Sequence, residues 1–309
     1  MTSTEIKNLP ASVRARLLNL AKERREDFTG LLTRYALERF MYRLATSQHA
    51  GRFVLKGATL FAIWSDQPHR ATRDLDLLGF GANDVPTLVE VFRQVCRQEV
   101  QPDGLVFDAD SVKGGLIRED RIYEGVRVTL TATLARARIA VQVDVGFGDS
   151  VFPAAVSIEV PVLLDFPAPV LNAYAKETVV AEKLQAMVAL GIVNSRMKDF
   201  YDIWVLARDN AFDGAVLAEA VRRTFERRGS PLPTSPPVAL TTEFSSDSAK
   251  VVQWRAFVRR GRLVAGEPAL DEVVASLARF LLPVLGLGEA RVTGQRRWPP
   301  GGPWRVSAD

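Results

Sequence analysis

The apolar residues of this chain follow two spacings, one typical of helices and one typical of strands. From 12 to about 46 they recur every three or four residues, with an interruption near 27–30, which predicts two helices. Alternating or β-branched stretches predict strands over 54–55, 74–77, 105–107, 127–133 and 139–145. Helical spacing is found over 60–64 and 84–100, and after a proline-rich connector over 176–190, 194–208, 213–228, 250–258 and 270–284. A β-rich region thus lies between N-terminal helices and a long helical C-terminal region.

The composition is that of a globular protein, and it narrows the available chemistry. Of the 309 residues, 47% are hydrophobic, but no apolar run approaches the roughly 20 residues of a membrane helix and no secretory segment opens the chain. We therefore expect a cytoplasmic protein without membrane contact. Cys96 is the only cysteine, and its apolar neighbours predict an inert core thiol, so any bound metal should be held by oxygen. The net charge of +4 permits contact with nucleic acid, although a solvated basic surface explains it equally well.

The stretch 53–79 carries the first candidate site. It places a Lys-Gly turn at 56–59 ahead of a predicted strand that contains Asp74 and Asp76. Side chains alternate along a strand, so these two aspartates share one face. Adjacent carboxylates repel each other, and Mg²⁺, which binds through one or two carboxylates and the phosphates of a substrate, would relieve that repulsion. The spacing predicts a metal-nucleotide site.

A third carboxylate stands near the end of the last predicted strand. Over 141–148 alternate valines share one face, whereas Gln142 and Asp144 share the other. Asp144 can therefore join Asp74 and Asp76 from an adjacent strand, and the two glycines that follow it would let backbone approach a ligand closely. An exposed aspartate at a strand end explains the same pattern without a site.

Two predicted helices of the C-terminal region carry a further charged set. Lys183 lies on the first, and the second carries Lys198, Asp199 and Asp202. Residues three or four apart on a helix are neighbours, so Asp202 can meet either of the other two. The alternative is a local charge network, including a salt bridge between Asp199 and Arg196, and such surface networks contribute only about 0.2–0.5 kcal/mol per pair.

Taken in order, these motifs resemble the AbiEii family of nucleotidyltransferase toxins, which includes the mycobacterial MenT proteins. The turn at 56–59 followed by Thr-Arg-Asp-Leu-Asp at 72–76 resembles the first family motif, and Asp-Val-Gly-Phe-Gly at 144–148 resembles the third. Lys183, followed after twelve residues by Arg-Met-Lys-Asp-Phe-Tyr-Asp at 196–202, resembles the last. The resemblance covers most of the chain.

The resemblance implies roles for individual residues. Those implied to be catalytic are Asp74, Asp76, Asp144, Lys183 and Asp202. The first three would hold Mg²⁺, with Asp144 serving a second metal ion or the acceptor hydroxyl. Lys183 would contact the triphosphate, and Asp202, or as a weaker candidate Asp199, would act near the acceptor or orient Lys183. The residues implied to contact the nucleotide are Lys56, Gly57, Thr59, Thr72, Lys198 and Asp199.

This chain departs from the family pattern at two places. Its turn reads Gly-Ala-Thr where many related transferases have Gly-Ser, so the Thr59 hydroxyl or backbone N–H groups would have to contact phosphate. A glutamate often placed five residues before the motif lysine falls on Thr178, with Glu177 one position out, and a helix turns about 100° per residue. Thr72 stands where the family has a serine, which makes it a candidate for nucleotide contact or regulatory modification.

The implied fold is α+β, with a polymerase β-like nucleotidyltransferase core of a small mixed sheet flanked by helices, followed by a helical C-terminal region. We expect N-terminal helices packing on the core over 1–50, the core over 51–165, a helical domain over 166–285 and a flexible tail over 286–309. The implied function is transfer of nucleotides from an NTP with Mg²⁺ to the 3′ end of tRNA, neutralised by a cognate antitoxin protein. Nucleotidylation of a protein side chain and a non-catalytic nucleotide- or RNA-binding module stay open as alternatives.

Overall fold

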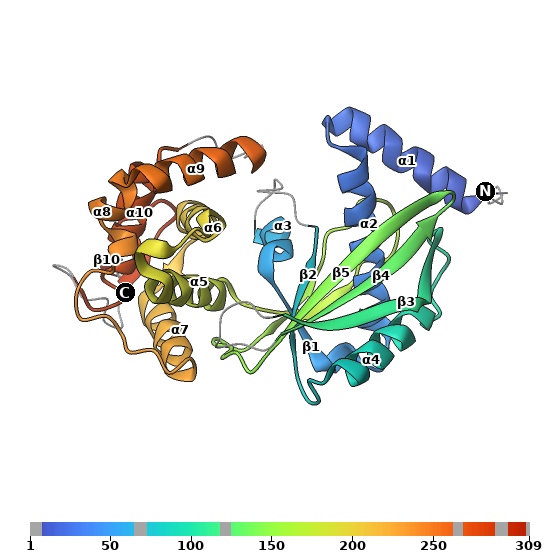
Figure 1. Cartoon of the computed structure of the whole chain (residues 1–309), viewed down its shortest axis with the longest axis horizontal. Helices are drawn as coiled ribbons and strands as arrows, with labels where there is room; N and C mark the ends of the chain where they lie inside the picture. Colours follow the sequence, from blue (N-terminus) through green and yellow to red (C-terminus); the bar gives the residue numbers. More distant parts are fainter. Residues whose placement is uncertain (1–7, 65–72, 118–124, 262–267, 288–295, 307–309) are drawn as a thin grey trace. The chain divides into compact units, whose positions relative to one another are not determined.

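The computed structural model describes residues 8–64, 73–117, 125–261, 268–287 and 296–306 (Figure 1). The chain divides into two compact units. Unit 1 consists of Met1–Ile63, Ala71–Gly148 and Val156–Ala173, and unit 2 consists of Trp64–Arg70, Asp149–Ala155 and Tyr174–Asp309. None of the helices in the described ranges has both the length and the apolarity that crossing a membrane requires.

The described residues up to 173 form a mixed sheet with helices. The helices are α1 (Leu9–Arg24), α2 (Phe28–Thr46), α3 (Phe61–Trp64) and α4 (Val85–Arg97), with 3₁₀ turns at Ala50–Arg52 and Gly57–Leu60. The strands are β1 (Phe53–Lys56), β2 (Leu75–Gly79), β3 (Leu105–Ile117), β4 (Gly125–Leu134), β5 (Ala137–Phe147), β6 (Val156–Glu159) and β7 (Val170–Ala173). Within the described ranges these seven strands lie in the order β3-β4-β5-β2-β1-β7-β6. β2 runs parallel to β5 and β1 runs parallel to β7, whereas the other neighbours are antiparallel.

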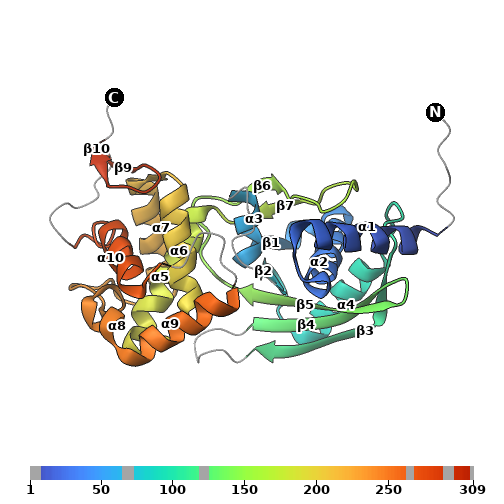
Figure 2. The same ribbon diagram turned by 90° about the horizontal axis from the view of Figure 1, so that it is seen from above.

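The long strands β3, β4 and β5 present one apolar and one polar face. Along β4 the side chains of Val126, Val128, Leu130, Ala132 and Leu134 are buried, while the alternate positions are half-buried or exposed. Helices α2 and α4 pack on the apolar face (Figure 2), as expected for a sheet with one covered side. The polar face is therefore the one on which charged side chains can gather.

A buried ionic cluster fixes α2 to two loops of unit 1. Arg43 Nη1 donates to Asp103 Oδ2 at 2.6 Å, and Arg39 Nε donates to the same oxygen at 3.2 Å. Both arginines and Asp103 are nearly inaccessible to solvent. Arg39 also donates to the Pro167 carbonyl, and the Leu163 N–H donates to the Glu38 carboxylate. Buried charges are tolerated when paired and hydrogen-bonded in this way, so the cluster ties the connector before β7 to the core.

Unit 2 is mainly helical. Its helices are α5 (Lys176–Leu190), α6 (Met197–Asp209), α7 (Gly214–Arg227), α8 (Thr242–Ser246), α9 (Ser248–Gly261) and α10 (Leu270–Leu281), with 3₁₀ turns at Gly191–Val193 and Val238–Leu240. A small sheet joins β8 (Phe212–Asp213), β9 (Arg296–Trp298) and β10 (Arg305–Val306). The helix predicted over 176–190 coincides with α5, and the interruption predicted near 27–30 falls where Asp27 caps the start of α2 by accepting from Gly30 N. The short helix α8 was not predicted.

Part of the segment 286–309, for which we expected a flexible tail, makes specific contacts with unit 2 in the described residues. Trp298 is buried, and its indole N–H donates to the Ala207 carbonyl at 2.7 Å. Its ring lies 4.8 Å from that of Phe280 and 5.5 Å from that of Trp304, measured between centroids. The last passage of the chain from unit 1 to unit 2 falls at Ala173/Tyr174, whereas we expected a boundary at 165/166. The strand β7 belongs to unit 1 because it pairs with β1 and β6.

Candidate active site

Unit 1 brings together the three aspartates that the strand pattern pointed to. Asp76 on β2 and Asp144 on β5 are direct partners in the parallel register. Asp74 immediately precedes β2, and each of the three offers a carboxylate oxygen within 4.8 Å of those of the other two. All three residues are half-buried. The prediction that Asp144 joins the pair from an adjacent strand is confirmed as to position.

The cluster belongs to a row of charged residues that crosses four strands. Lys56 on β1 is opposite Asp76, Asp76 is opposite Asp144, and Asp144 is opposite Arg127 on β4. Residues opposite one another in a sheet point to the same face. The row therefore reads positive, negative, negative, positive, so the paired carboxylates lie between two cations on the polar face.

The turn after β1 comes very close to the cluster, which explains its glycine. Gly57 has φ +77°, a left-handed conformation that favours glycine. A Cβ built at this position would overlap the Asp76 carboxylate. Thr59 is half-buried within the turn that follows, and Lys56 is also half-buried. The backbone at 56–59 thus lies directly beside a candidate cation ligand.

Sequence reasoning missed Arg127, which binds Asp144 through two hydrogen bonds. Nε donates to Oδ1 at 2.8 Å and Nη2 donates to Oδ2 at 2.7 Å, the two-pronged arrangement that guanidinium and carboxylate groups favour. Gln142 Nε2 also donates to Oδ2, at 3.3 Å. The alternation of β4 placed Arg127 on the polar face, but only the pairing of β4 with β5 shows which carboxylate it meets.

The donor set fits a hard divalent cation such as Mg²⁺. It consists of carboxylate oxygens, the ligands that such cations prefer, and oxygens sharing one octahedral Mg²⁺ at about 2.1 Å lie about 3 Å apart. Because the three carboxylates already have oxygens within 4.8 Å of one another, closing on an ion requires movements of about 2 Å at most. Lys56 and Arg127 flank the carboxylates in the charged row, and a cation among the three aspartates would reduce their mutual repulsion further.

Unit 2 brings together the charged residues of the last motif. Lys183 on α5 reaches two aspartates of α6, with Nζ 2.7 Å from Asp199 Oδ1 and 2.9 Å from Asp202 Oδ2. Both aspartates are completely buried, and the Lys183 side chain is 13% exposed. Asp199 lies in the first turn of α6, where the helix dipole favours negative charge. The sequence left open whether Asp199 or Asp202 lies beside Lys183, and both contact it in the structure.

The carboxylates keep Lys183 charged. Burial disfavours the ammonium form, but attraction by Asp199 and Asp202 outweighs this effect and raises the pKa of Lys183. Arg196 Nε lies 2.6 Å from Asp199 Oδ2, although the alignment is too poor for a hydrogen bond. The salt bridge weighed as an alternative for Asp199 therefore coexists with its contact to Lys183, giving two cations against two carboxylates.

Other predicted residues have simpler surroundings. Lys198 is exposed and forms neither an ion pair nor a hydrogen bond with any described residue. Thr178 Oγ1 donates to the Phe152 carbonyl at 2.8 Å, a contact within the protein itself. Glu177 Oε1 lies 3.7 Å from Lys176 Nζ. Thr72 lies outside the described residues.

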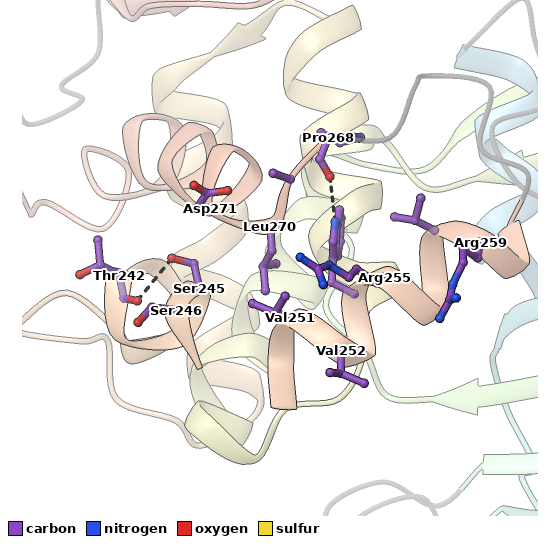
Figure 3. Close-up of a pocket in the computed structure, with 13 residues that line it drawn as sticks. Thr242, Ser245, Ser246, Val251, Val252, Arg255, Arg259, Pro268, Leu270 and Asp271 are labelled. Carbon is purple, nitrogen blue, oxygen red and sulfur yellow. Dashed lines mark hydrogen bonds between the residues drawn. The ribbon is translucent and has the colours of Figure 1, made fainter. Parts of the chain in front are cut away.

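A hollow of about 980 Å³ in unit 2 lies elsewhere, between α8, α9 and the start of α10 (Figure 3). Its apolar lining includes Val251 and Leu270, and the indole N–H of Trp254 donates to the Pro268 carbonyl at its edge. None of the predicted site residues lines it, so the hollow is not the site described above.

Comparisons with known proteins bear on what this site does. The model of the family described as "Nucleotidyl transferase AbiEii toxin, Type IV TA system" matches residues 39–276. The structure is similar to that of JHP933 from Helicobacter pylori, with 15% identity, a TM-score of 0.46, and coverage of 80% of this chain and 88% of the other. A candidate nucleotidyltransferase from H. pylori gives the same identity and TM-score, with 80% and 91% covered. No curated protein sequence matches the chain significantly.

Proposed function

Because the chain belongs to the AbiEii family of nucleotidyltransferase toxins of type IV toxin-antitoxin systems, we propose that it transfers nucleotides from an NTP to the 3′ end of tRNA with Mg²⁺. The observation that carries the cation requirement is the Asp74, Asp76 and Asp144 cluster, whose oxygens lie within 4.8 Å of one another. The RNA acceptor rests on the family resemblance, and the pI of about 9.3 is compatible with it.

In this proposal the unit 1 residues bind and orient the reacting groups. Asp74 and Asp76 hold the cation, and Asp144 either serves a second cation or accepts the proton of the acceptor hydroxyl. A bound Mg²⁺ supplies charge neutralisation at the triphosphate and orients it for attack. Gly57 lets the turn approach the Asp76 carboxylate, so Thr59 and the adjacent backbone N–H groups can lie near the phosphates.

The unit 2 residues supply a fixed positive charge. Lys183 has three N–H donors, and its contacts with Asp199 and Asp202 hold the ammonium group in place. A preorganised cation of this kind stabilises charge that develops on a leaving pyrophosphate. Lys56 and Lys198 are further candidates for phosphate contact. That the clusters of the two units act on one substrate remains a prediction from the family motifs.

The function is tested by incubating purified protein with Mg²⁺ and each labelled NTP, offering total RNA and total protein in parallel. We expect the label in small RNA, loss of labelling with excess EDTA, and a decrease of roughly a hundredfold or more in Asp74→Ala. Asp110→Ala is the matched control, because that carboxylate is 94% exposed and belongs to the edge strand β3. Full activity of Asp74→Ala would refute the site assignment.

The same assay separates the alternatives. Label found in protein rather than RNA would make a side chain the acceptor. NTP binding by calorimetry without metal dependence, together with absence of labelling, would indicate a non-catalytic binding module. Neutralisation is tested by growth: expression of the chain should arrest cells, and co-expression of an antitoxin-like protein encoded next to it should restore growth. The expected cytoplasmic location remains a prediction.

A further inference from the structure

The ion pair between Arg127 and Asp144 involves one of the three carboxylates of the proposed metal site. Of the three clustered carboxylates, Asp144 has both oxygens engaged by one guanidinium. Its side chain is 16% exposed and that of Arg127 is 42% exposed. Asp144, a proposed cation ligand, is thus already paired with the positive charge of Arg127 on the neighbouring strand β4.

This pairing affects cation binding in two ways. The guanidinium occupies the lone pairs on the side of Asp144 that faces β4, so the carboxylate is oriented toward Arg127. Its positive charge also repels a cation that approaches the same carboxylate, because charges a few ångströms apart near a protein surface interact appreciably. Arg127 and the cation therefore compete for Asp144.

We propose that Arg127 is a positioning residue that holds Asp144 as a counter-ion in the cation-free protein and releases this carboxylate when a divalent cation binds. The inference rests on the proposed metal role of the three aspartates. After release, the guanidinium can donate to a phosphate oxygen on the same polar face, since arginine matches phosphate geometry well. Arg127 thereby keeps the like-charged cluster compact before the cation and nucleotide arrive.

A purely orienting role for Arg127 makes the opposite prediction. A side chain that holds a metal ligand in its binding orientation raises metal affinity, and its removal typically weakens binding by 10- to 100-fold. A competing counter-ion lowers the affinity, so its removal strengthens binding. The sign of the change therefore distinguishes the two roles.

The test is Mn²⁺ titration of the full-length protein by calorimetry, without nucleotide. We expect Arg127→Gln to bind Mn²⁺ about tenfold more tightly than the unmodified protein, and Arg127→Lys, which keeps the charge but loses the two-pronged contact, to fall between them. Arg138→Gln is the matched control, because it removes the same charge from an exposed position about 20 Å along β5 from Asp144. Thermal unfolding of each variant checks that it is folded.

Asp76→Asn identifies the site, since it should abolish the Mn²⁺ binding in both backgrounds. Failure of the unmodified protein to bind Mn²⁺ at these aspartates would overturn the proposed metal role and this inference together. Binding that depends on Asp76 but is unchanged or weaker in Arg127→Gln would overturn the inference alone and leave the proposed function standing.

Discussion

The Lys183 cluster predicts that the motif lysine is needed for stability as well as for chemistry. Lys183→Ala would leave two carboxylates that have no exposed surface, with Arg196 as the remaining contact of Asp199. Removing one partner of a buried ion pair costs about 3–5 kcal/mol, because the remaining charge loses a counter-charge in a poorly solvated place. The contact of Asp199 with Arg196 places Lys183→Ala toward the lower end of this range. For a unit of this size each kcal/mol lowers the midpoint of thermal unfolding by about 2–4 °C, so we expect a decrease on the order of 10 °C.

The assay is thermal or urea unfolding of three variants beside the unmodified protein. Lys198→Ala, on the exposed surface of the next helix, should change the free energy of unfolding by less than about 0.5 kcal/mol. In Lys183→Ala/Asp202→Asn one of the buried charges is gone, so the double variant should be more stable than the sum of the single changes predicts, by about 1 kcal/mol or more. If Lys183→Ala unfolds at the same temperature as the unmodified protein, the reasoning about the buried cluster is wrong.

Three further predictions concern the turn glycine, a buried acid and the C-terminal segment. Gly57→Ala should weaken Mn²⁺ binding and destabilise the protein, because its Cβ meets the Asp76 carboxylate, whereas Gly51→Ala, whose Cβ meets nothing within 4 Å, should change neither in parallel titrations and melts. Burial raises the pKa of Glu38 from 4.5 to about 7, so between these pH values the folded protein keeps a proton that the unfolded chain loses. The free energy of unfolding should therefore decrease as the pH rises from about 4.5 to 7, and the contribution of Glu38 should be constant above pH 7. Urea unfolding of Glu38→Gln at a series of pH values should lack this decrease. Trp298→Ala should cost about 3–5 kcal/mol in urea unfolding, whereas a flexible tail would give no change.

Local pattern was sufficient to predict the face of the sheet on which Asp76 and Asp144 lie. The alternation along β2 and β5 puts Asp76 and Asp144 on one face of the sheet and the buried valines and leucines on the other. This alternation can be read from neighbouring residues alone. The helices α5 and α6 were predicted on the same basis. The residue types and spacing of the family motifs then indicated which charges belong to a site.

Contacts from one strand to the next could not be predicted in this way. Nothing in the local sequence of β4 says that Arg127 pairs with Asp144 rather than pointing into solvent, because the pairing depends on the register of two long strands. The packed segment around Trp298 was missed for a related reason. Its prolines and glycines are typical of loops, and its order comes from tertiary contacts with Phe280 and the Ala207 carbonyl.

The charged row across β1, β2, β5 and β4 forms only when these four strands pair in the correct register. Each member is contributed by a different strand, and a slip of one residue between two strands would turn every side chain of the slipped strand to the opposite face. Such a slip would move Asp144 into the apolar layer and its flanking valines into water. The hydrophobic core therefore requires the same strand alignment as the carboxylate cluster, so a chain folded in the wrong register would be unstable and would also lack the cluster.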